Sequence, residues 1–219
     1  MKLLITGAAS GIGRACTEFY SSEDVTGIDR QDLDLNDCSA VSDYIDACND
    51  FDVMIYCAGI REIEAPHRLS YQTWQNVLNV NLNACFLFSQ GLIKKALSCR
   101  RPLTIVNIAS VSGFQAESDR AAYVSSKYAM IGLTKQLAWQ YGREGIRVNA
   151  IAPGIVETPL TRSYFEDEVS AERIKSAIPL GYWGGTENIV SLVDVCITNN
   201  YINGAVMVCD GGWTIGRNI

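Results

Sequence analysis

The chain has 219 residues, of which 48% are apolar and 19% are charged, and its formal net charge is −6. A negative charge without a cluster of Lys or Arg argues against nucleic acid or an anionic membrane surface as a partner. The apolar runs are too short to span a bilayer and the first residues lack a secretion signal, so we expect a cytoplasmic protein.

The chain shows no sign of a division into parts. No stretch rich in Pro, Gly or Ser and no charge block interrupts it, which predicts a single domain over residues 1–219. The eight cysteines are scattered among apolar neighbours without a Cys-x-x-Cys pair, and the only histidine is His67. This pattern predicts reduced, mostly buried thiols and no metal site.

Short β-rich apolar runs alternate with longer segments of helical periodicity. The pattern predicts strands over residues 2–6, 25–29, 52–56, 103–108, 146–151 and 205–209. It predicts helices over residues 11–21, 39–48, 70–98, 122–141 and 187–198. Such βαβ units predict an α/β fold, a Rossmann-like doubly wound parallel sheet in a three-layer αβα arrangement.

The segment between residues 29 and 52 departs from this alternation. It has room for one short helix, whereas a parallel strand directly after the second one would need a crossover of about a dozen residues. We therefore predict that the usual third strand is shortened or missing. Residues 33–36 would then form a loop that closes a ligand pocket.

The first predicted strand runs into a glycine-rich turn, Thr6-Gly7-Ala8-Ala9-Ser10-Gly11-Ile12-Gly13, and a helix follows. Such a turn lets the backbone approach a pyrophosphate, and the helix N-terminus offers N–H groups and partial positive charge to the phosphates. Alone, the pattern also fits a merely structural turn. The acid Asp29, 22 residues after Gly7, adds the carboxylate expected to bind an adenosine ribose.

Asp29 also separates the two nicotinamide cofactors. Its carboxylate would repel the 2′-phosphate of NADP, which favours NAD. Ser10 supplies no cation for that phosphate. Arg30 argues the other way, but we interpret it as a solvated loop residue.

A Tyr-x-x-x-Lys pair, Tyr123 and Lys127, lies near the start of the helix predicted over residues 122–141. Residues four apart share one helix face, so the phenol and the ammonium can serve one site. The pair also occurs often by chance. Ser110 supports the functional interpretation, because it directly follows a strand, where ligand-facing residues of such sheets collect.

Together these motifs resemble those of the short-chain dehydrogenase/reductase family along the whole chain. In order, they are Thr6-Gly7-x-x-x-Gly11-x-Gly13, Asn79-Val80-Asn81-Leu82, Ile105-Val106-Asn107-Ile108-Ala109-Ser110, Tyr123 with Lys127, the segment from Arg147 to Thr158, and Asp210-Gly211-Gly212. One departure is Tyr56-Cys57-Ala58-Gly59, where the family often has Asn-Asn-Ala-Gly. We expect it to alter local hydrogen bonding rather than chemistry.

The resemblance implies an oxidoreductase that moves a hydride between nicotinamide and a carbonyl or alcohol carbon. It implies that Tyr123 is the general acid/base and that Ser110 donates to the substrate oxygen. Lys127 would hold the nicotinamide ribose and lower the pKa of the tyrosine, and Asn81 would position a water of the proton relay. An ammonium about 4 Å from the phenol contributes on the order of the 4 kcal/mol that a pKa depression of about three units requires.

With NAD as the cofactor, the resemblance implies binding residues from six segments. They are Gly7, Ser10, Gly11, Ile12, Gly13, Asp29, Asp34, Leu35, Ala58, Gly59, Tyr123, Lys127, Pro153, Gly154, Val156 and Thr158. Asp34 and Leu35 would flank the adenine. Val156 and Thr158 would orient the carboxamide.

The substrate side is less sharply defined. Its candidates are Ser110, Ser112, Tyr123 and Arg61, with Ile60, Glu62, Phe114, Gln115, Arg120, Tyr164 and Phe165 nearby in the sequence. Residues 159–180 form the predicted lid. Arg61 or Arg120 could pair with a substrate carboxylate, although a solvated surface arginine is the preferred interpretation of each. His67 has no role in the implied mechanism.

Three functions stay open on the sequence. An NAD-dependent dehydrogenase of a small or cyclic secondary alcohol leads; the others are a 3-oxoacyl reductase of fatty-acid type, which usually prefers NADP, and a non-catalytic NAD-binding protein. The helices over residues 70–98 and 122–141 are apolar on more than one face and must bury both sides. The resemblance implies a homodimer through them, or a homotetramer that also uses the C-terminal strand and its helix, while packing within one chain is the alternative.

Overall fold

Six parallel strands form one sheet in the computed structural model, which describes residues 1–216, so the last three residues of the predicted domain lie outside it. The strand order is β2-β1-β3-β4-β5-β6. The strands are β1 (Lys2–Thr6), β2 (Asp24–Ile28), β3 (Val53–Tyr56), β4 (Leu103–Ile108), β5 (Ile146–Pro153) and β6 (Val206–Cys209). The predicted Rossmann-like parallel sheet is confirmed, and its strand bounds differ from the predicted ones by two residues at most.

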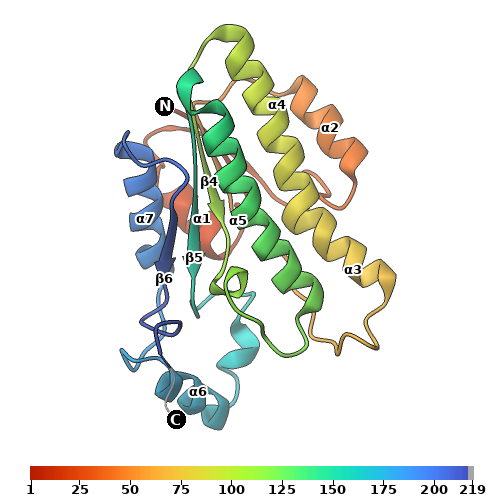
Figure 1. The fold of residues 1–219 in the computed structure, drawn as a ribbon, viewed down its shortest axis with the longest axis vertical. Coiled ribbons are helices and arrows are strands. Elements are labelled where there is room, and N and C mark those ends of the chain that lie inside the picture. The colour runs from red at the N-terminus through yellow and green to blue at the C-terminus, as the bar shows by residue number, and fades with distance from the viewer. Residues whose placement is uncertain (217–219) are drawn as a thin grey trace.

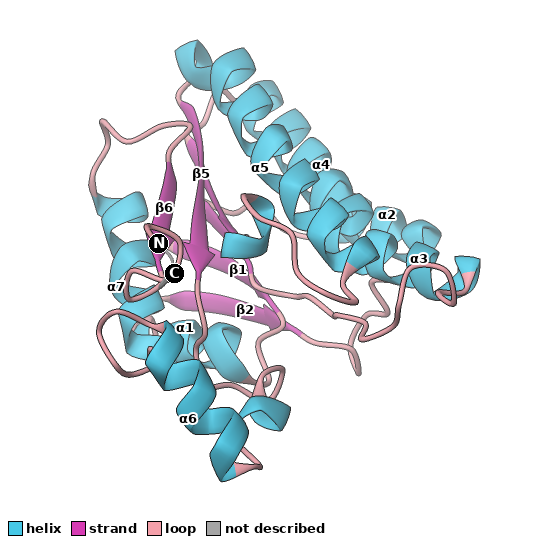
Figure 2. Ribbon diagram, turned by 60° about the horizontal axis from the view of Figure 1, so that its bottom comes forward, coloured by secondary structure: helices cyan, strands magenta, loops and turns pink. Residues whose placement is uncertain are grey.

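Helices cover both faces of the sheet (Figures 1 and 2). They are α1 (Gly11–Phe19), α2 (Cys38–Ala47), α3 (Tyr71–Leu78), α4 (Ala84–Cys99), α5 (Ala121–Tyr141), α6 (Glu168–Ala177) and α7 (Thr186–Thr198). Helices α2, α4 and α5 lie on one face, and α1 and α7 lie on the other (Figure 2). No helix within residues 1–216 is long and apolar enough to cross a bilayer.

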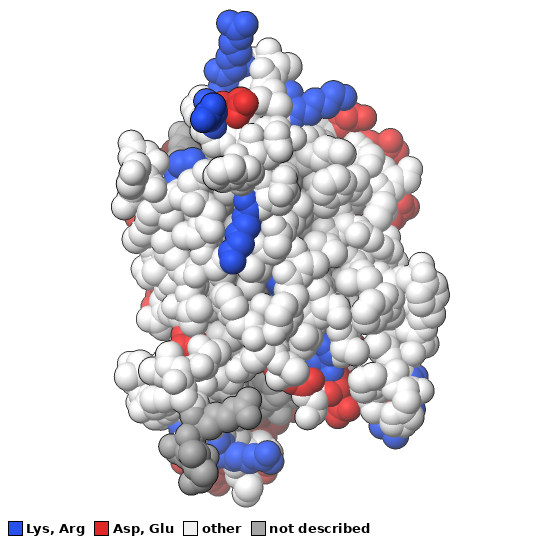
Figure 3. All heavy atoms as spheres, viewed as in Figure 1, with Lys and Arg blue, Asp and Glu red and all other residues white. Residues whose placement is uncertain are grey.

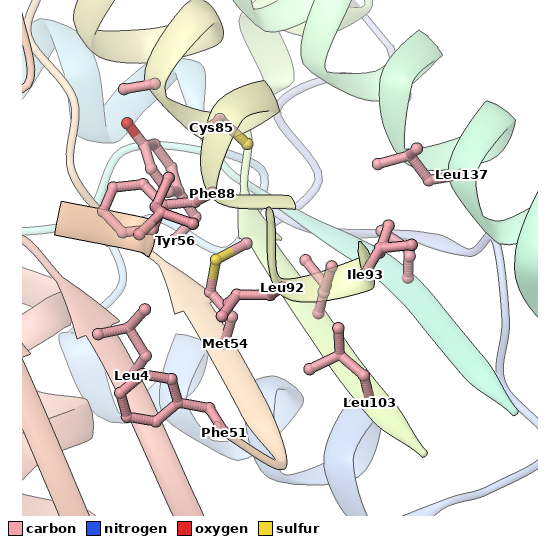
Figure 4. Packing of buried hydrophobic residues seen from close by; sticks show 14 of the residues in the cluster. Leu4, Phe51, Met54, Tyr56, Cys85, Phe88, Leu92, Ile93, Leu103 and Leu137 are labelled. Carbon is pink, nitrogen blue, oxygen red and sulfur yellow. The ribbon is translucent and has the colours of Figure 1, made fainter. Parts of the chain in front are cut away.

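The alternation of side chains along each strand builds two cores. In β1, Leu4 faces the cluster that includes Phe88 and Leu92 of α4, whereas Leu3 and Ile5 face the cluster with α1 and α7. Figure 4 shows the first of these cores, in which Met54 and Tyr56 of β3 contact the α4 side chains. Since both sheet faces are buried, β3 is apolar at every position, as expected of a parallel strand in this architecture.

The prediction of a missing third strand is confirmed within the described residues. The chain passes from β2 to α2 through a loop over residues 29–37 and then crosses to β3 on the other side of β1. Asp37 ends this loop by accepting hydrogen bonds from the backbone N–H groups of Ser39 and Ala40, which caps α2. The strand order therefore reverses between β1 and β3, the place where ligands bind in open α/β sheets.

Two helical predictions need correction. The continuous helix predicted over residues 70–98 is interrupted by a π-helical segment, Asn79–Asn83, between α3 and α4. Helix α6 was not predicted, because its sequence is mostly polar and its only buried residue is Ala171. The π-helical segment contributes Val80 to the lining of the pocket described below.

Candidate active site

A pocket of about 510 Å³ opens at the carboxyl ends of β1, β2 and β3. It brings together these residues of the predicted cofactor set: Gly7, Ser10, Gly11, Ile12, Gly13, Asp29, Asp34, Leu35, Ala58, Gly59 and Thr158. The loop residues Leu33 and Asn36 also line it, so the predicted loop does close a pocket. The residues that line the pocket extend from the glycine turn to the segment that follows β3.

The glycine turn is so tight that side chains cannot fit into it. Gly7 has φ +68°, and a Cβ on Gly13 would lie 2.1 Å from the carbonyl oxygen of Gly7. Helix α1 begins at Gly11, and the Ser10 side chain makes no capping hydrogen bond. The first N–H groups of α1 are therefore left to a ligand, and they suit a pyrophosphate.

Asp29 lies immediately after β2 at the far end of the pocket. Its carboxylate accepts hydrogen bonds from the backbone N–H groups of Ala9 at 2.9 Å and Arg30 at 2.6 Å. These bonds hold the acid toward the glycine turn, where a ribose diol would lie. Arg30 is exposed, as the sequence interpretation expected, but it also lines the pocket next to Asp29, where a cation would favour a 2′-phosphate.

The turn after β3 connects the pocket to the predicted catalytic residues. The backbone N–H of Ala58 donates to the Thr6 hydroxyl at 3.1 Å, so the turn is anchored without the asparagines that the family often has there. A Cβ on Gly59 would lie 3.6 Å from Oδ1 of Asn81 and 3.7 Å from Nζ of Lys127. Gly59 therefore stands between the cofactor pocket and the proton-handling groups.

The π-helical segment holds Asn81, which is completely buried. Its amide oxygen accepts from the Ile60 N–H at 2.8 Å, and its amide nitrogen donates to the Ile60 carbonyl at 2.9 Å and to the Ser126 hydroxyl at 3.0 Å. The wide turn of a π helix is often found at functional sites. Here it fixes the loop after β3 against α5.

Tyr123 and Lys127 lie one turn apart on α5. The Lys127 ammonium is buried 5.6 Å from the centre of the Tyr123 ring and donates to the Ile108 carbonyl at 2.8 Å. Burial lowers the pKa of Lys127 to about 8. The structure thus places the predicted pair together at the end of β4.

The expected lowering of the tyrosine pKa is not what this structure gives. Burial raises the pKa of Tyr123 to about 12, outweighing the hydrogen bond with Ser110. The charge of Glu117 raises this pKa further, while the charge of Arg61 lowers it. The phenol is therefore protonated at neutral pH unless a further positive charge comes close.

Ser110 and Ser112 form a hydroxyl pair next to Tyr123. The two oxygens are 3.0 Å apart, and the Ser112 N–H donates to the Ser110 hydroxyl at 3.1 Å. The Ser112 hydroxyl donates in turn to Glu117 through a short hydrogen bond. Sequence reasoning gave no role to Glu117, and an exposed acid in a polar stretch offered no signal.

Arg120 corrects the sequence interpretation of a solvated arginine. It is 5% exposed and donates to the Glu62 carbonyl at 2.6 Å and to the Tyr164 hydroxyl at 3.0 Å. The buried Glu62 carboxylate accepts from the backbone N–H of Ala122 at 2.7 Å and of Tyr123 at 3.1 Å. Glu62 thereby caps α5, a role that its distance from that helix in the sequence concealed.

Several predicted residues lie apart from the pocket lining. Pro153 ends β5 and Val156 is buried below the surface. Gly154 packs against Asp210, since a Cβ added to Gly154 would lie 2.7 Å from the Cα of Asp210. Phe114 is exposed beside the site, and His67 is exposed on a loop with no contact to the catalytic cluster among the hydrogen bonds of residues 1–216.

Comparisons with known proteins identify relatives of this chain. A family model described as enoyl-(acyl carrier protein) reductase matches residues 30–214. The 2-dehydro-3-deoxy-D-gluconate 5-dehydrogenase of Bacillus subtilis is 38% identical over 74% of this chain, which spans 64% of that relative. A 3-oxoacyl-[acyl-carrier-protein] reductase of Thermotoga maritima is 31% identical over 97% of both chains.

Solved structures extend the similarity to the whole fold. A 4-hydroxyisoleucine dehydrogenase complexed with NADH is 37% identical, with a TM-score of 0.93 over 99% of this chain and 100% of that one. A structure from Agrobacterium tumefaciens that contains NADP is 31% identical, with a TM-score of 0.89 over 99% of this chain and 97% of that one. Similar proteins therefore bind either nicotinamide cofactor.

Proposed function

Because the chain belongs to the short-chain dehydrogenase/reductase family, we propose that it is an NAD-dependent dehydrogenase of a small substrate with a secondary alcohol or ketone. Its relatives are dehydrogenases and reductases, and the chain is an oxidoreductase that acts on CH–OH groups with a nicotinamide cofactor. The observation that carries the proposal is the position of Gly59, which lines the pocket at a point where a side chain would meet Asn81 and Lys127.

The residues present fit a dinucleotide. The glycine turn leaves no room for side chains where a pyrophosphate would approach, and the uncapped start of α1 offers free N–H groups. Asp29 would accept hydrogen bonds from the adenosine ribose, and Asp34 and Leu35 line the pocket where the adenine would lie. When bound, the nicotinamide supplies or accepts the hydride.

The chain's own residues handle the proton. Tyr123 would exchange a proton with the substrate oxygen while Ser110 donates a hydrogen bond to the same oxygen. Lys127 would bind the nicotinamide ribose and keep its positive charge near the phenol. Asn81 fixes the Ile60 backbone and Ser126, so it would hold the relay residues in position.

Asp29 supports NAD over NADP. Its carboxylate is already held by two backbone N–H groups and would repel a 2′-phosphate at short range. The alternative of a 3-oxoacyl reductase draws support from the Thermotoga maritima relative, but it fits a preference for NADP less well. A non-catalytic NAD-binding protein would have no need of the buried ammonium beside Tyr123.

Replacing the phenol tests the proposed chemistry. Tyr123→Phe keeps the ring but removes the acid/base group, so we expect turnover to fall at least about 100-fold while NAD binds as before. Turnover is followed at the NADH absorbance with a panel of secondary alcohols and ketones, and NAD binding is measured by calorimetry. Tyr71→Phe, at an exposed position of α3, is the matched control. Unchanged turnover in Tyr123→Phe would remove this mechanism.

We also propose a homodimer through α4 and α5, with a homotetramer as its extension. The face over these helices carries few charged side chains near its centre (Figure 3). Phe86 on α4 is 40% exposed, and Tyr128 and Trp139 on α5 are 47% and 88% exposed. Such an apolar face favours burial against a second copy.

A cytoplasmic location and a single domain complete the proposal. All eight cysteines are free, which suits a reducing compartment. One sheet and its two cores run through the described residues from β1 to β6, which supports one folding unit.

A further inference from the structure

Two guanidinium groups meet one tyrosine at the substrate side of the site. The Arg61 guanidinium lies 4.4 Å from the centre of the Tyr164 ring and donates to the Ser163 hydroxyl at 3.2 Å. Arg120 donates to the hydroxyl of the same tyrosine at 3.0 Å. Tyr164 belongs to a short 3₁₀ helix, Arg162–Tyr164, within the predicted lid.

Neither guanidinium has an acidic partner. Among residues 1–216, no carboxylate oxygen lies within 4.0 Å of Arg61 or Arg120, whereas Arg14, Arg68 and Arg101 each form ion pairs. The nearest acid in the sequence, Glu62, is occupied by the N–H groups at the start of α5. Half-buried and held by one hydroxyl, Arg61 keeps donors free for an anion.

Arg61 is also close to the proposed reacting group. The next residue, Glu62, accepts from the Tyr123 backbone at 3.1 Å, so Arg61 is tied to the start of α5. Tyr164, on which Arg61 stacks, also accepts a hydrogen bond from Arg120, three residues before Tyr123. The charge of Arg61 lowers the pKa of Tyr123. An anion bound to Arg61 would therefore lie within a small molecule's reach of the Tyr123 hydroxyl.

Arg120 holds the neighbours of Arg61 in place. It is buried and its donors go to the Glu62 carbonyl and to Tyr164. It thus fixes both the loop that carries Arg61 and the tyrosine on which Arg61 stacks. On the other side of the site, Glu117 would repel an anion placed beside Ser112, which leaves the Arg61 end for a negative charge.

We propose that the substrate is a small hydroxy or keto compound with a carboxylate group, and that the Arg61 guanidinium binds this carboxylate. The planar guanidinium matches a carboxylate with two parallel hydrogen bonds. Arg120 and Tyr164 act as positioning residues that hold Arg61 and the lid segment in place. The inference rests on the proposed dehydrogenase function and narrows its substrate class.

A comparison of acids with their neutral amides tests the inference. A panel of short hydroxycarboxylic acids and their primary amides is assayed for NAD reduction with the wild type, Arg61→Gln, Arg61→Lys and Arg143→Gln. We expect wild-type kcat/KM to be higher for the acid, and Arg61→Gln to lower it about 10- to 100-fold for the acid only. Arg61→Lys should recover part of the loss, because it restores the charge without the bidentate geometry. Arg143→Gln, at an exposed position just after α5 and with the same change of charge, should change neither value.

A binding measurement separates this inference from the proposed function. In calorimetry on the NADH complex, 3-methylbutanoate should bind more tightly than 3-methylbutanamide, and Arg61→Gln should remove the difference. If this difference is absent, or if amides and acids are turned over equally, the carboxylate assignment is overturned while the dehydrogenase proposal stands. If Arg61-dependent binding is found without hydride transfer from any alcohol, the proposed function falls and the anion site stands. Circular dichroism and melting curves confirm that each variant folds.

Discussion

Burial controls the ionisation of the two residues proposed to move the proton. It raises the pKa of Tyr123 to about 12 and lowers the pKa of Lys127 to about 8, so it opposes charge on both side chains. At neutral pH only the Lys127 shift destabilises the fold, because the phenol of Tyr123 is uncharged in both the folded and the unfolded chain. A cationic oxidised nicotinamide in the adjoining pocket would favour the phenolate and so lower the pKa of Tyr123 toward neutrality.

The cost of the buried ammonium predicts a pH-dependent stability difference. Lys127 has an ordinary pKa of 10.5 when unfolded and about 8 when folded, so below pH 8 its charge destabilises the fold by about 3 kcal/mol. Between pH 8 and 10.5 the unfolded chain binds more protons, and this destabilisation disappears as the pH rises. The Lys127→Met variant should therefore gain most over the wild type below pH 8.

Urea unfolding at several pH values measures this difference. The gain in unfolding free energy of Lys127→Met should shrink toward pH 10.5, even though the variant loses turnover. Lys135→Met, at an exposed position of the same helix, is the control and should show no such trend. A gain for Lys127→Met that stays constant with pH would contradict the buried-charge explanation.

Asp29 carries the prediction on cofactor choice. In Asp29→Ala, the repulsion of a 2′-phosphate disappears together with an acceptor for the ribose, so kcat/KM should fall for NAD and rise for NADP. The ratio of the two values should shift by at least about tenfold, corresponding to 1.4 kcal/mol. Steady-state kinetics with both cofactors measures it. A wild-type preference for NADP would refute the charge argument.

At the scale of elements, close packing of a turn against a helix shapes the cofactor pocket. Helix α1 begins at Gly11, and the turn before it packs so closely on the helix that only glycine fits at position 13. The π-helical segment Asn79–Asn83 acts similarly for the loop after β3, since it turns Asn81 toward Ile60 and Ser126. In both places the backbone departs from regular geometry, and this departure fixes the position of residues at the site.

Two glycine-to-alanine changes separate packing from helix propensity. Gly13→Ala places a Cβ 2.1 Å from the Gly7 carbonyl oxygen, so we expect lost NAD binding and a lower melting temperature. Gly132→Ala, within α5, meets nothing within 4 Å and should stabilise the protein by about 0.5–1 kcal/mol. Calorimetry of NAD binding and thermal melting measure both variants. Normal NAD affinity in Gly13→Ala would show that the turn can relax.

At the scale of the molecule, the two helix layers differ in what covers them. The α4 and α5 face exposes aromatic side chains and few charges, which supports the proposed dimer (Figure 3). Helix α6 and the short helix before it lie at the opposite end from the start of β5 and stand over the carboxyl ends of the strands (Figure 1). The proposed assembly surface and the predicted lid are thus separate regions.

We expect a charged substitution on the α4 and α5 face to disrupt the proposed assembly. Phe86→Glu adds a carboxylate to the proposed interface, so the mass measured by light scattering after size-exclusion chromatography should fall to half the wild-type value, which for a homodimer is the mass of one chain. Phe19→Glu, on an exposed position of α1, is the matched control and should keep the wild-type mass. A wild-type mass for Phe86→Glu would place the interface elsewhere.

Local sequence determined the sheet, most helices and the glycine turn, because periodicity, β-branched runs and tight turns are properties of neighbouring residues. The spacing of Tyr123 and Lys127 is likewise local, since four residues make one helical turn. The missing third strand also followed from chain length alone, because residues 29–52 are too few for a further βα unit.

Only the tertiary structure decided the surroundings of these residues. Three features join segments more than 40 residues apart in the chain. They are the capping of α5 by Glu62, the burial of Arg120 and the stacking of Arg61 on Tyr164. The raised pKa of Tyr123 also depends on what packs around the phenol rather than on its neighbours in the chain. Desolvation and long-range hydrogen bonds arise only when distant segments meet, so no local pattern encodes them.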